Sequence, residues 1–412
     1  MVRGESELGR PTPSSYLPAM PRRAIVTLVT RNYAHFAQVL VASCRAAHPE
    51  AAIFVCYADR PPADWREAVP GTRVVYGDEL GIPDWRTFSF QYTPFELSCA
   101  LKPHLLRHVI DQGYDEVVYL DGDMRVYGPL ASAFAALEQS SLVLTPHLLA
   151  PLPDDGERPH EQAFLVSGTY NAGFLAVRRD ETTDRFLGWW TTMVAERCIT
   201  DLSASLFVDQ KWLDLVPGLF LGVHVLRDPG CNAGHWTLSQ FRFEPLADTS
   251  RTRSGVSVGG APLVLFHFSR LTPAAPDDYL NSQTRVRLTA THPLTPLVRD
   301  YHAALDAAGR ARCESWGCGF DTLSDGTPIR PAWREAVRRR HSAVSAIADP
   351  FDAVARPGLQ KVYRGLEGEA VKWRRDWRLR SPQPRGLKGR VQKAKTRLKT
   401  ILRVLRHSRK SA

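Results

Sequence analysis

The chain has 412 residues, of which 44% are hydrophobic and 23% charged, proportions that are ordinary for a soluble globular protein. Its net charge of +10 belongs to one end, because residues 377–412 hold 13 Lys and Arg and no acidic residue, which leaves −3 for residues 1–376. No run of 18 apolar residues is present, so no transmembrane helix is expected, and the polar, proline-bearing residues 1–21 are predicted to be disordered and not a signal peptide.

Strands and helices are predicted to alternate along the first part of the chain. Short apolar runs predict strands at residues 24–30, 52–57, 73–76, 116–120 and 142–145. Helical spacing of apolar residues predicts helices at 33–47, 94–110 and 130–138, the second of them kinked or broken at Pro103. This alternation is typical of a parallel α/β sheet with helices on both faces.

The middle of the chain is less regular. Residues 147–162 form a long polar loop with three prolines, which we interpret as a lid over a pocket. Strands are predicted at 173–177, 219–226 and 263–268, and helices at 180–197, capped by Asp180, and at 207–216. Residues 244–262 are predicted to be a mobile surface loop. Further on, a helix is predicted at 296–308 and a structural hairpin at 316–330.

Asp121 and Asp123 come directly after the apolar strand predicted at 116–120. Unpaired carboxylates cannot continue into an apolar core, so they are expected at the strand's end, where open α/β sheets place their ligands. Hard oxygen ligands at that place suit Mg²⁺ or Mn²⁺, ions that accompany a diphosphate. The alternative is a plain Asp-Gly-Asp turn. The buried strand before it favours a metal–nucleotide site.

Polar residues also follow other predicted elements, and each has a structural alternative. Thr30, Asn32 and Tyr33 follow the first strand and offer polar groups and a ring to a nucleotide base, or else cap the next helix. Lys102 either reaches a diphosphate as a point charge or is a solvated surface group. His267 ends an apolar strand and is either a third metal ligand or a core histidine.

Two further pairs of residues lie at element boundaries. Asn171 and Gly173 bracket the start of a strand, which is also good turn chemistry. Asp209 and Gln210 open the helix predicted at 207–216, where the alternative role of Asp209 is an N-cap.

The order of these motifs is more specific than any one of them. The succession TLVTRNY, ALKP, YLDGDM, YNAGF, DQKWL and FHFS resembles the GT-A glycosyltransferases, in particular family 8 with glycogenin and the bacterial lipopolysaccharide galactosyltransferases, over about residues 22–270. The resemblance implies a GT-A, Rossmann-like fold and metal-dependent transfer of a sugar from a nucleotide-diphosphate sugar, most often a UDP-sugar. It implies a saccharide or glycolipid acceptor at the cell surface, and retention of the anomeric configuration.

The resemblance also implies roles for single residues. Asp121, Asp123 and His267 would hold Mn²⁺ or Mg²⁺, and Thr30, Asn32 and Tyr33 would face the base and ribose, with Lys102 at the phosphates. Asn171, Asp209 and Gln210 would line the sugar and acceptor side as catalytic residues, and Gly173 would belong to the donor-binding residues. Family members commonly carry a glycine and a lysine after the histidine. Here Phe268, Ser269 and Arg270 follow, so Arg270 is the candidate substitute at the diphosphate.

The chain divides into a catalytic domain at 22–275, a mostly helical extension at 276–376 and a basic tail at 377–412. Residues 389–407 alternate apolar and basic residues as a basic amphipathic helix does, which suits an anionic membrane surface, and the alternative is a solvated disordered tail. No nucleic-acid motif accompanies the tail, which disfavours that partner.

Seven scattered cysteines fit a reducing compartment, so we expect a cytoplasmic protein, peripheral on the inner face of the cell membrane. Two alternatives to a glycosyltransferase are a nucleotidyltransferase that makes nucleotide sugars and a non-catalytic protein that binds membrane surfaces. The first usually has a glycine-rich phosphate loop after its first strand, whereas this chain has TRNYAHF there.

Overall fold

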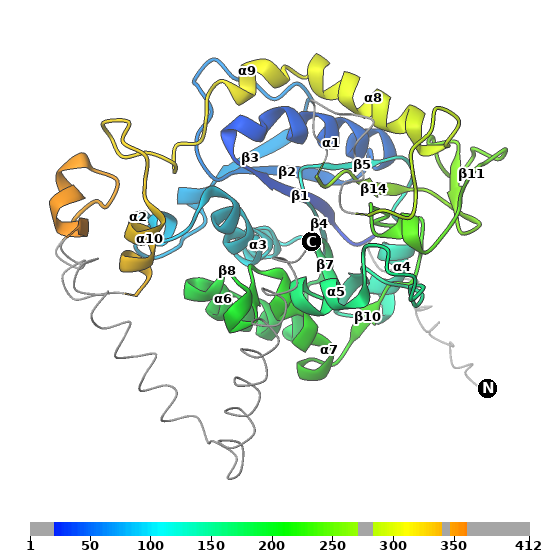
Figure 1. Cartoon of the computed structure of the whole chain (residues 1–412), viewed down its shortest axis with the longest axis horizontal. Coiled ribbons are helices and arrows are strands. Elements are labelled where there is room, and N and C mark those ends of the chain that lie inside the picture. The colour runs from blue at the N-terminus through cyan, green and yellow to red at the C-terminus, as the bar shows by residue number, and fades with distance from the viewer. Residues whose placement is uncertain (1–19, 271–282, 340–346, 361–412) are drawn as a thin grey trace, which may run out of the picture.

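The computed structural model describes residues 20–270, 283–339 and 347–360. A seven-stranded sheet crosses the molecule, with helices on both of its faces (Figure 1). From one edge to the other its strands are β10 (Val223–Val225), β6 (Leu142–Pro146), β7 (Tyr170–Arg178), β4 (Glu116–Leu120), β1 (Arg23–Val29), β2 (Ala52–Tyr57) and β3 (Thr72–Tyr76). The predicted α/β class is confirmed.

The sheet is mainly parallel, as expected, with one strand reversed. β7 runs antiparallel to both of its neighbours, β4 and β6, and every other pairing in this sheet is parallel. An apolar run has the same pattern in either direction, so the sequence could not reveal this reversal. Its consequence is that the beginning of β7 lies beside the end of β4, with Phe174 opposite Leu120.

Alternate residues of the strands build two hydrophobic layers. Val26, Val117 and Leu175 face the layer that also contains α3 (Pro94–Asp111) and α6 (Glu181–Arg197). Their neighbours along the strands face the other layer, which contains α1 (Ala34–Ala47) and α4 (Ala131–Gln139). Strands buried on both faces have continuous apolar sequences, which is why their positions were predicted well.

Helix α3 shows how packing outweighs a local signal. It begins with a capping box, in which the Thr93 side chain accepts a hydrogen bond from the Glu96 amide. We expected a kink or a break at Pro103. The break is wrong, since the helix continues through Pro103 to Asp111, and the kink stays a prediction. An internal proline costs about 3 kcal/mol, whereas Leu101, Leu105 and Leu106 are fully buried and each contributes about 1.5–3 kcal/mol. Helix α6 begins at the predicted cap, where Asp180 accepts from the Thr183 amide.

Smaller elements surround the sheet. The strands are β5 (Met124–Val126), β8 (Thr200–Asp201), β9 (Leu206–Phe207), β11 (Phe243–Pro245), β12 (Val256–Val258), β13 (Ala261–Pro262) and β14 (Leu265–His267). The helices include η1 (Arg31–Tyr33), α2 (Trp85–Phe90), α5 (Glu161–Ser167), η4 (Gln210–Leu215), α7 (Val216–Leu219), α8 (Leu294–Ala307), α9 (Arg310–Glu314) and α10 (Pro331–Arg338), besides four other short 3-10 turns in the described residues. β11, β12 and β13 form an antiparallel sheet, so the expectation that residues 244–262 are one loop is wrong.

Some predictions concern residues outside the described ranges. The basic tail at 377–412 lies wholly outside them, as do residues 1–19 of the N-terminal segment. Within the ranges that the structure does describe, no helix has the length and apolar character needed to cross a membrane.

Candidate metal and nucleotide site

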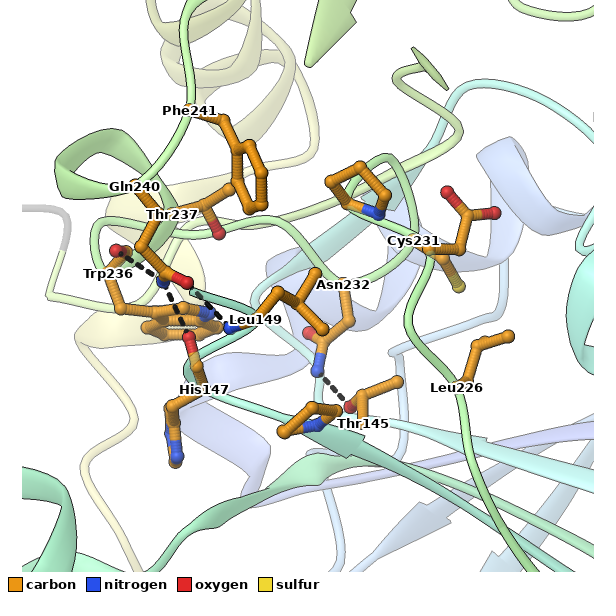
Figure 2. A pocket seen from close by; sticks show the side chains of 13 residues that line it. Thr145, His147, Leu149, Leu226, Cys231, Asn232, Trp236, Thr237, Gln240 and Phe241 are labelled. Carbon is orange, nitrogen blue, oxygen red and sulfur yellow. Dashed lines mark hydrogen bonds between the residues drawn. The ribbon is translucent and has the colours of Figure 1, made fainter. Parts of the chain in front are cut away.

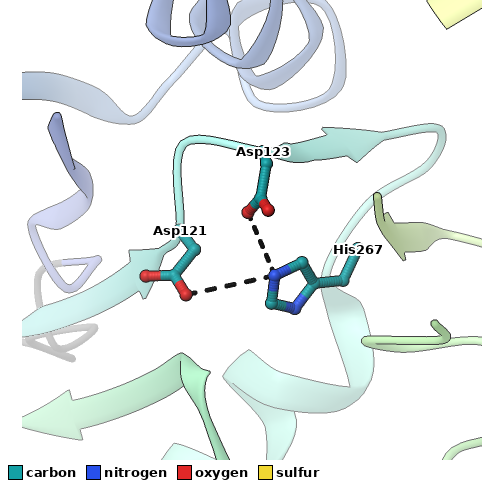
Figure 3. A group of neighbouring side chains, drawn as sticks. All are labelled: Asp121, Asp123 and His267. Atoms are coloured by element: carbon teal, nitrogen blue, oxygen red, sulfur yellow. Dashed lines mark ion pairs between the residues drawn. The ribbon is translucent and has the colours of Figure 1, made fainter. Parts of the chain in front are cut away.

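Asp121, Asp123 and His267 come together at the end of β4 (Figure 3). The turn after β4 carries both aspartates and leads into β5, and β14 pairs with β5 so that His267 lies opposite Met124. His267 Nε2 lies 3.0 Å from Asp123 Oδ1 and 4.0 Å from Asp121 Oδ2. One ligand atom from each of the three residues lies within 4.8 Å of the others. The sequence thus predicted a cluster in which His267 lies 144 residues beyond Asp123 along the chain.

Charge pairing governs the protonation of this cluster. Burial opposes ionisation of Asp123, but the charge and hydrogen bond of His267 outweigh it and hold the pKa of Asp123 below its usual value. Burial likewise opposes protonation of His267, and the Asp123 carboxylate nevertheless raises its pKa. Asp123 and His267 thus each favour the charged form of the other.

The donor set fits a divalent cation. Two carboxylates and one imidazole are ligands that Mn²⁺ accepts, and carboxylates suit Mg²⁺ as well. Gly173 leaves room beside them, because a Cβ there would lie 2.6 Å from His267 Cε1 and 2.8 Å from Asp121 Oδ2. The side chain of Asp123 is 30% exposed and that of Asp121 29%, so the cluster is open to a ligand.

Lys102 lies behind the cluster and joins two carboxylates. Its ammonium lies 3.1 Å from Asp121 Oδ1 and 3.1 Å from Asp209 Oδ2, and it donates a 3.0 Å hydrogen bond to the carbonyl of Ala172. It is buried, so it is not the solvated surface lysine of the alternative interpretation. Burial works against its charge, yet the two aspartates raise the pKa of Lys102 well above its usual value. Contact between Lys102 and a phosphate stays a prediction.

The side chain of Asp209 is held by its ion pair with Lys102 and makes no capping bond to a helix end. It begins η4 without a side-chain capping bond and is 1% exposed. Burial raises the pKa of Asp209, and the neighbouring Lys102 opposes that rise. The N-cap alternative is therefore wrong.

Asn171 and Gln210 shape the start of β7. Asn171 Oδ1 accepts from the Gly173 amide and from Asn232 at 3.1 Å, and its Nδ2 lies 3.1 Å from Nε2 of His147. Gln210 accepts from the Ala172 amide at 3.1 Å and donates to the Ser167 carbonyl at 2.9 Å. Both side chains thus fix the strand next to the metal cluster, and their contact with a sugar stays a prediction.

A buried polar network continues this support away from the cluster (Figure 2). Asn232 donates to the Thr145 hydroxyl at 2.6 Å, and Gln240 bonds to the His147 carbonyl and the Leu149 amide. The small cavity that these residues line has about 10 Å³, room for about one water molecule. Burial lowers the pKa of His147 to about 4, so its ring is neutral.

A cavity of about 520 Å³ opens beside the aspartates. That volume lies within the range of small-molecule sites, about 300–1,000 Å³. Its lining brings together six of the predicted site residues: Thr30, Asn32, Tyr33, Lys102, Asp121 and Asp123. The end of β1 and the end of β4 are thus joined in one pocket, as expected for neighbouring parallel strands.

The remaining predicted residues lie outside that lining. Asn171, Gly173, Asp209, Gln210 and His267 form its surroundings, through the contacts given above. Arg270 is exposed, three residues beyond His267, and its role at the diphosphate stays a prediction.

Sequence reasoning missed several residues of this site, among them Tyr119, Cys318 and Asp321. Tyr119 donates a 2.8 Å hydrogen bond to Asp121 Oδ1, and Cys318 and Asp321 line the cavity from far along the chain. The signal for Tyr119 was its place two residues before Asp121 on a strand, where side chains share a face. We find no motif at 318–321 that predicts such a contact.

Comparison with known proteins gives distant similarities. No protein-family model matches the chain. It is 27% identical over 203 residues to YfnF, an uncharacterised protein of Bacillus subtilis strain 168, and the match covers 48% of this chain and 65% of YfnF. It is 22% identical over 253 residues to YfnD of the same organism, covering 60% of this chain and 77% of YfnD. The chain thus spans slightly less than two thirds of the length of YfnF.

Among solved structures, the galactosyltransferase LgtC in complex with donor and acceptor sugar analogues has a TM-score of 0.40 and 17% identity, over 68% of this chain and 95% of LgtC. The glycosyltransferase GlyE of Streptococcus pneumoniae TIGR4 has a TM-score of 0.40 and 15% identity, over 71% of this chain and 64% of GlyE. These neighbours are glycosyltransferases, the class that the motif order resembles.

Proposed function

We propose that this protein is a metal-dependent glycosyltransferase of the GT-A type, which uses a nucleotide-diphosphate sugar as its donor. One observation carries the proposal: the Asp121, Asp123 and His267 cluster borders a 520 Å³ cavity that also contains Thr30, Asn32 and Tyr33 at the end of β1. A metal–diphosphate group at one end of a cavity and polar groups for a nucleoside at the other describe a nucleotide-sugar site. We propose Mn²⁺ as the ion, because Mn²⁺ accepts an imidazole ligand more readily than Mg²⁺ does.

The central difficulty of glycosyl transfer is charge, which builds on the leaving diphosphate as the glycosidic bond breaks. When bound, a divalent cation supplies Lewis-acid stabilisation of that leaving group. Asp121, Asp123 and His267 would hold such an ion, and Tyr119 and Lys102 fix the Asp121 carboxylate through a hydrogen bond and an ion pair. Preorganised charges of this kind stabilise a transition state without moving.

The sugar side of the proposal rests on Asp209. Positive charge on the sugar ring would be stabilised by the negative potential of its carboxylate, which Lys102 holds in one place. Because Asp209 is 1% exposed and paired at 3.1 Å, it is poorly placed to take a proton from an acceptor opposite the leaving group. This supports attack from the face of the leaving group, and therefore retention of configuration.

The finer assignments belong to the same proposal. We propose a UDP-sugar as donor and a saccharide or glycolipid of the cell surface as acceptor, and a location on the cytoplasmic side of the membrane. The motif order supports the donor and the acceptor, and the basic sequence at 389–407 supports the location.

The test is turnover of a panel of UDP- and GDP-sugars, measured as release of the nucleoside diphosphate with Mn²⁺ and with excess chelator. We expect metal-dependent release with one donor and its loss in Asp123→Asn, whose fold is checked by circular dichroism. The matched control is Asp300→Asn. It removes an exposed carboxylate whose ion-pair partner, Arg125, lies two residues after Asp123. Release that is equal with and without metal, or equal in Asp123→Asn and the control, contradicts the proposal.

A further inference from the structure

The donor cavity is completed by a segment that lies outside the region of motif resemblance. Cys318 and Asp321 line it together with Tyr33, Phe95 and Asp121. The resemblance ends at about residue 270, so no family motif assigns a role to either residue.

Residues 316–321 are anchored to the end of β1. Arg31, which lies between Thr30 and Asn32, donates from Nε to the carbonyl of Gly317 at 3.1 Å and from Nη2 to that of Trp316 at 3.0 Å. The carboxylate of Asp59 accepts from the Arg31 amide at 2.8 Å and from the Gly319 amide at 2.7 Å. One buried aspartate thus bridges η1 and this segment.

A buried arginine anchors the other side of the same segment. Arg334 of α10 donates to the carbonyls of Phe90, Tyr92 and Phe320, and its side chain is 5% exposed. Because Phe90 ends α2 and Tyr92 lies two residues before α3, these bonds place Phe320, and therefore Asp321, near the beginning of α3. The segment is fixed from both sides, so its position in the cavity does not depend on a bound ligand.

Helix α3 runs along the cavity and separates its two ends. Phe95 lies in the first turn of α3, and Lys102 lies seven residues later, which at the rise of an α-helix is about 10 Å. The Lys102 end carries Asp121, at 3.1 Å. Asp321 belongs to the Phe95 end. A donor whose diphosphate lies at Asp121 and Asp123 can therefore extend its nucleoside along the cavity toward Asp321.

The chemistry at that end suits a nucleoside. The ring of Phe95, a residue that is 57% exposed, lines the cavity and can stack on a base. The side chain of Asp321 is 57% exposed, and Arg334 lies 4.0 Å from its Oδ1, beyond hydrogen-bond distance. A carboxylate accepts hydrogen bonds from N–H and O–H groups and repels phosphate.

We infer that Asp321 binds the nucleoside of the donor, by accepting a hydrogen bond from a ribose hydroxyl or a base N–H, and that the C-terminal extension thereby helps to select the nucleotide. The inference rests on the proposed function, because it takes the diphosphate to lie at Asp121 and Asp123.

The test is calorimetric titration of UDP and GDP, each with Mn²⁺, into the full chain and into Asp321→Asn. The substitution keeps the shape of an exposed side chain, and a thermal melt confirms the fold. We expect affinity for the preferred nucleotide to fall about tenfold, because a hydrogen bond to a charged carboxylate becomes a weaker one to a neutral amide oxygen. The matched control is Glu335→Gln in α10, which removes an exposed carboxylate of the same extension that pairs with Arg339 and should bind as the unaltered chain does.

Nucleotide analogues separate the two kinds of hydrogen-bond donor. If Asp321 binds a ribose hydroxyl, 2′-deoxy-UDP or 3′-deoxy-UDP should bind the unaltered chain more weakly than UDP does. The same analogue should then bind Asp321→Asn as tightly as it binds the unaltered chain. If a base N–H is bound, N3-methyl-UDP behaves in that way, and either result supports the inference.

Unchanged nucleotide affinity in Asp321→Asn, with binding lost in Asp123→Asn, overturns the inference and leaves the proposed function standing. Absence of nucleotide binding by the unaltered chain overturns both.

Discussion

Replacement of Lys102 by methionine is the perturbation for which the structure gives the clearest magnitude. The ammonium lies 3.1 Å from carboxylate oxygens of both Asp121 and Asp209, and Asp209 is 1% exposed. At an effective dielectric constant of about 20, each contact corresponds to a Coulomb energy of about 5 kcal/mol. Burial of the three charges offsets much of that sum. Removal of one partner of a buried ion pair leaves its carboxylate uncompensated and costs about 3–5 kcal/mol.

That loss corresponds to a change of about 10²- to 10⁴-fold in the unfolding equilibrium constant. Urea unfolding followed by the fluorescence of the 10 tryptophans measures it. The control is Lys211→Met, which breaks a 2.7 Å pair with Asp214 in which both side chains are about one-fifth exposed; it should cost about 1 kcal/mol or less. A loss in Lys102→Met no greater than in Lys211→Met would refute the reasoning.

The same variant has a predicted pH dependence. Burial raises the pKa of Asp209, and Lys102 opposes that rise, so the folded variant without Lys102 holds a proton on Asp209 more tightly than the unfolded chain does. A group of this kind stabilises the fold below its unfolded pKa, and the stabilisation is lost as pH rises through the folded pKa. The deficit of Lys102→Met should therefore be smaller at pH 5 than at pH 8. A deficit that is larger at pH 5 would contradict this account of Asp209.

Three further substitutions test separate parts of the structure. Gly173→Ala places a Cβ 2.6 Å from His267 Cε1, so Mn²⁺ affinity measured by electron paramagnetic resonance should fall tenfold or more; unchanged affinity would place the metal elsewhere. Arg285→Lys loses the planar fork that bonds Asp155 and the carbonyls of Pro153 and Pro159, so proteinase K should cleave residues 153–159 faster, and an equal rate would show that Arg285 does not hold this loop. Arg334→Met leaves three carbonyls without their donor at about 1–3 kcal/mol each, which should lower the urea midpoint; a midpoint within error of the unaltered protein would remove this anchor.

The sequence predicts the sheet well where its strands are buried on both faces. The predicted ranges 52–57 and 116–120 coincide with β2 and β4, because a strand that is buried on both faces has a continuous apolar sequence. Strand direction has no such signature, so the reversal of β7 was missed. The break expected at Pro103 failed for a different reason, since the local cost of a proline is smaller than the burial around it.

The site was partly predictable for similar reasons. The carboxylates after β4 could be placed, because charged groups must leave an apolar strand at its end. The partners of Lys102 could not, since its contacts join residues that are 19 and 107 positions away and nothing local distinguishes a phosphate from a carboxylate as the neighbour. Asp321 lies 200 residues beyond Asp121, and only the packing of Arg31, Asp59 and Arg334 brings it to the cavity.

The central claim is that Asp121, Asp123 and His267 make a metal site at which a nucleoside diphosphate binds. Calorimetric titration of UDP, and then of GDP, with and without Mn²⁺, tests it most directly. The account predicts binding of one of the two nucleotides that requires Mn²⁺ and is lost in Asp123→Asn. Binding that is the same with and without the metal, or absent for both nucleotides, would contradict it.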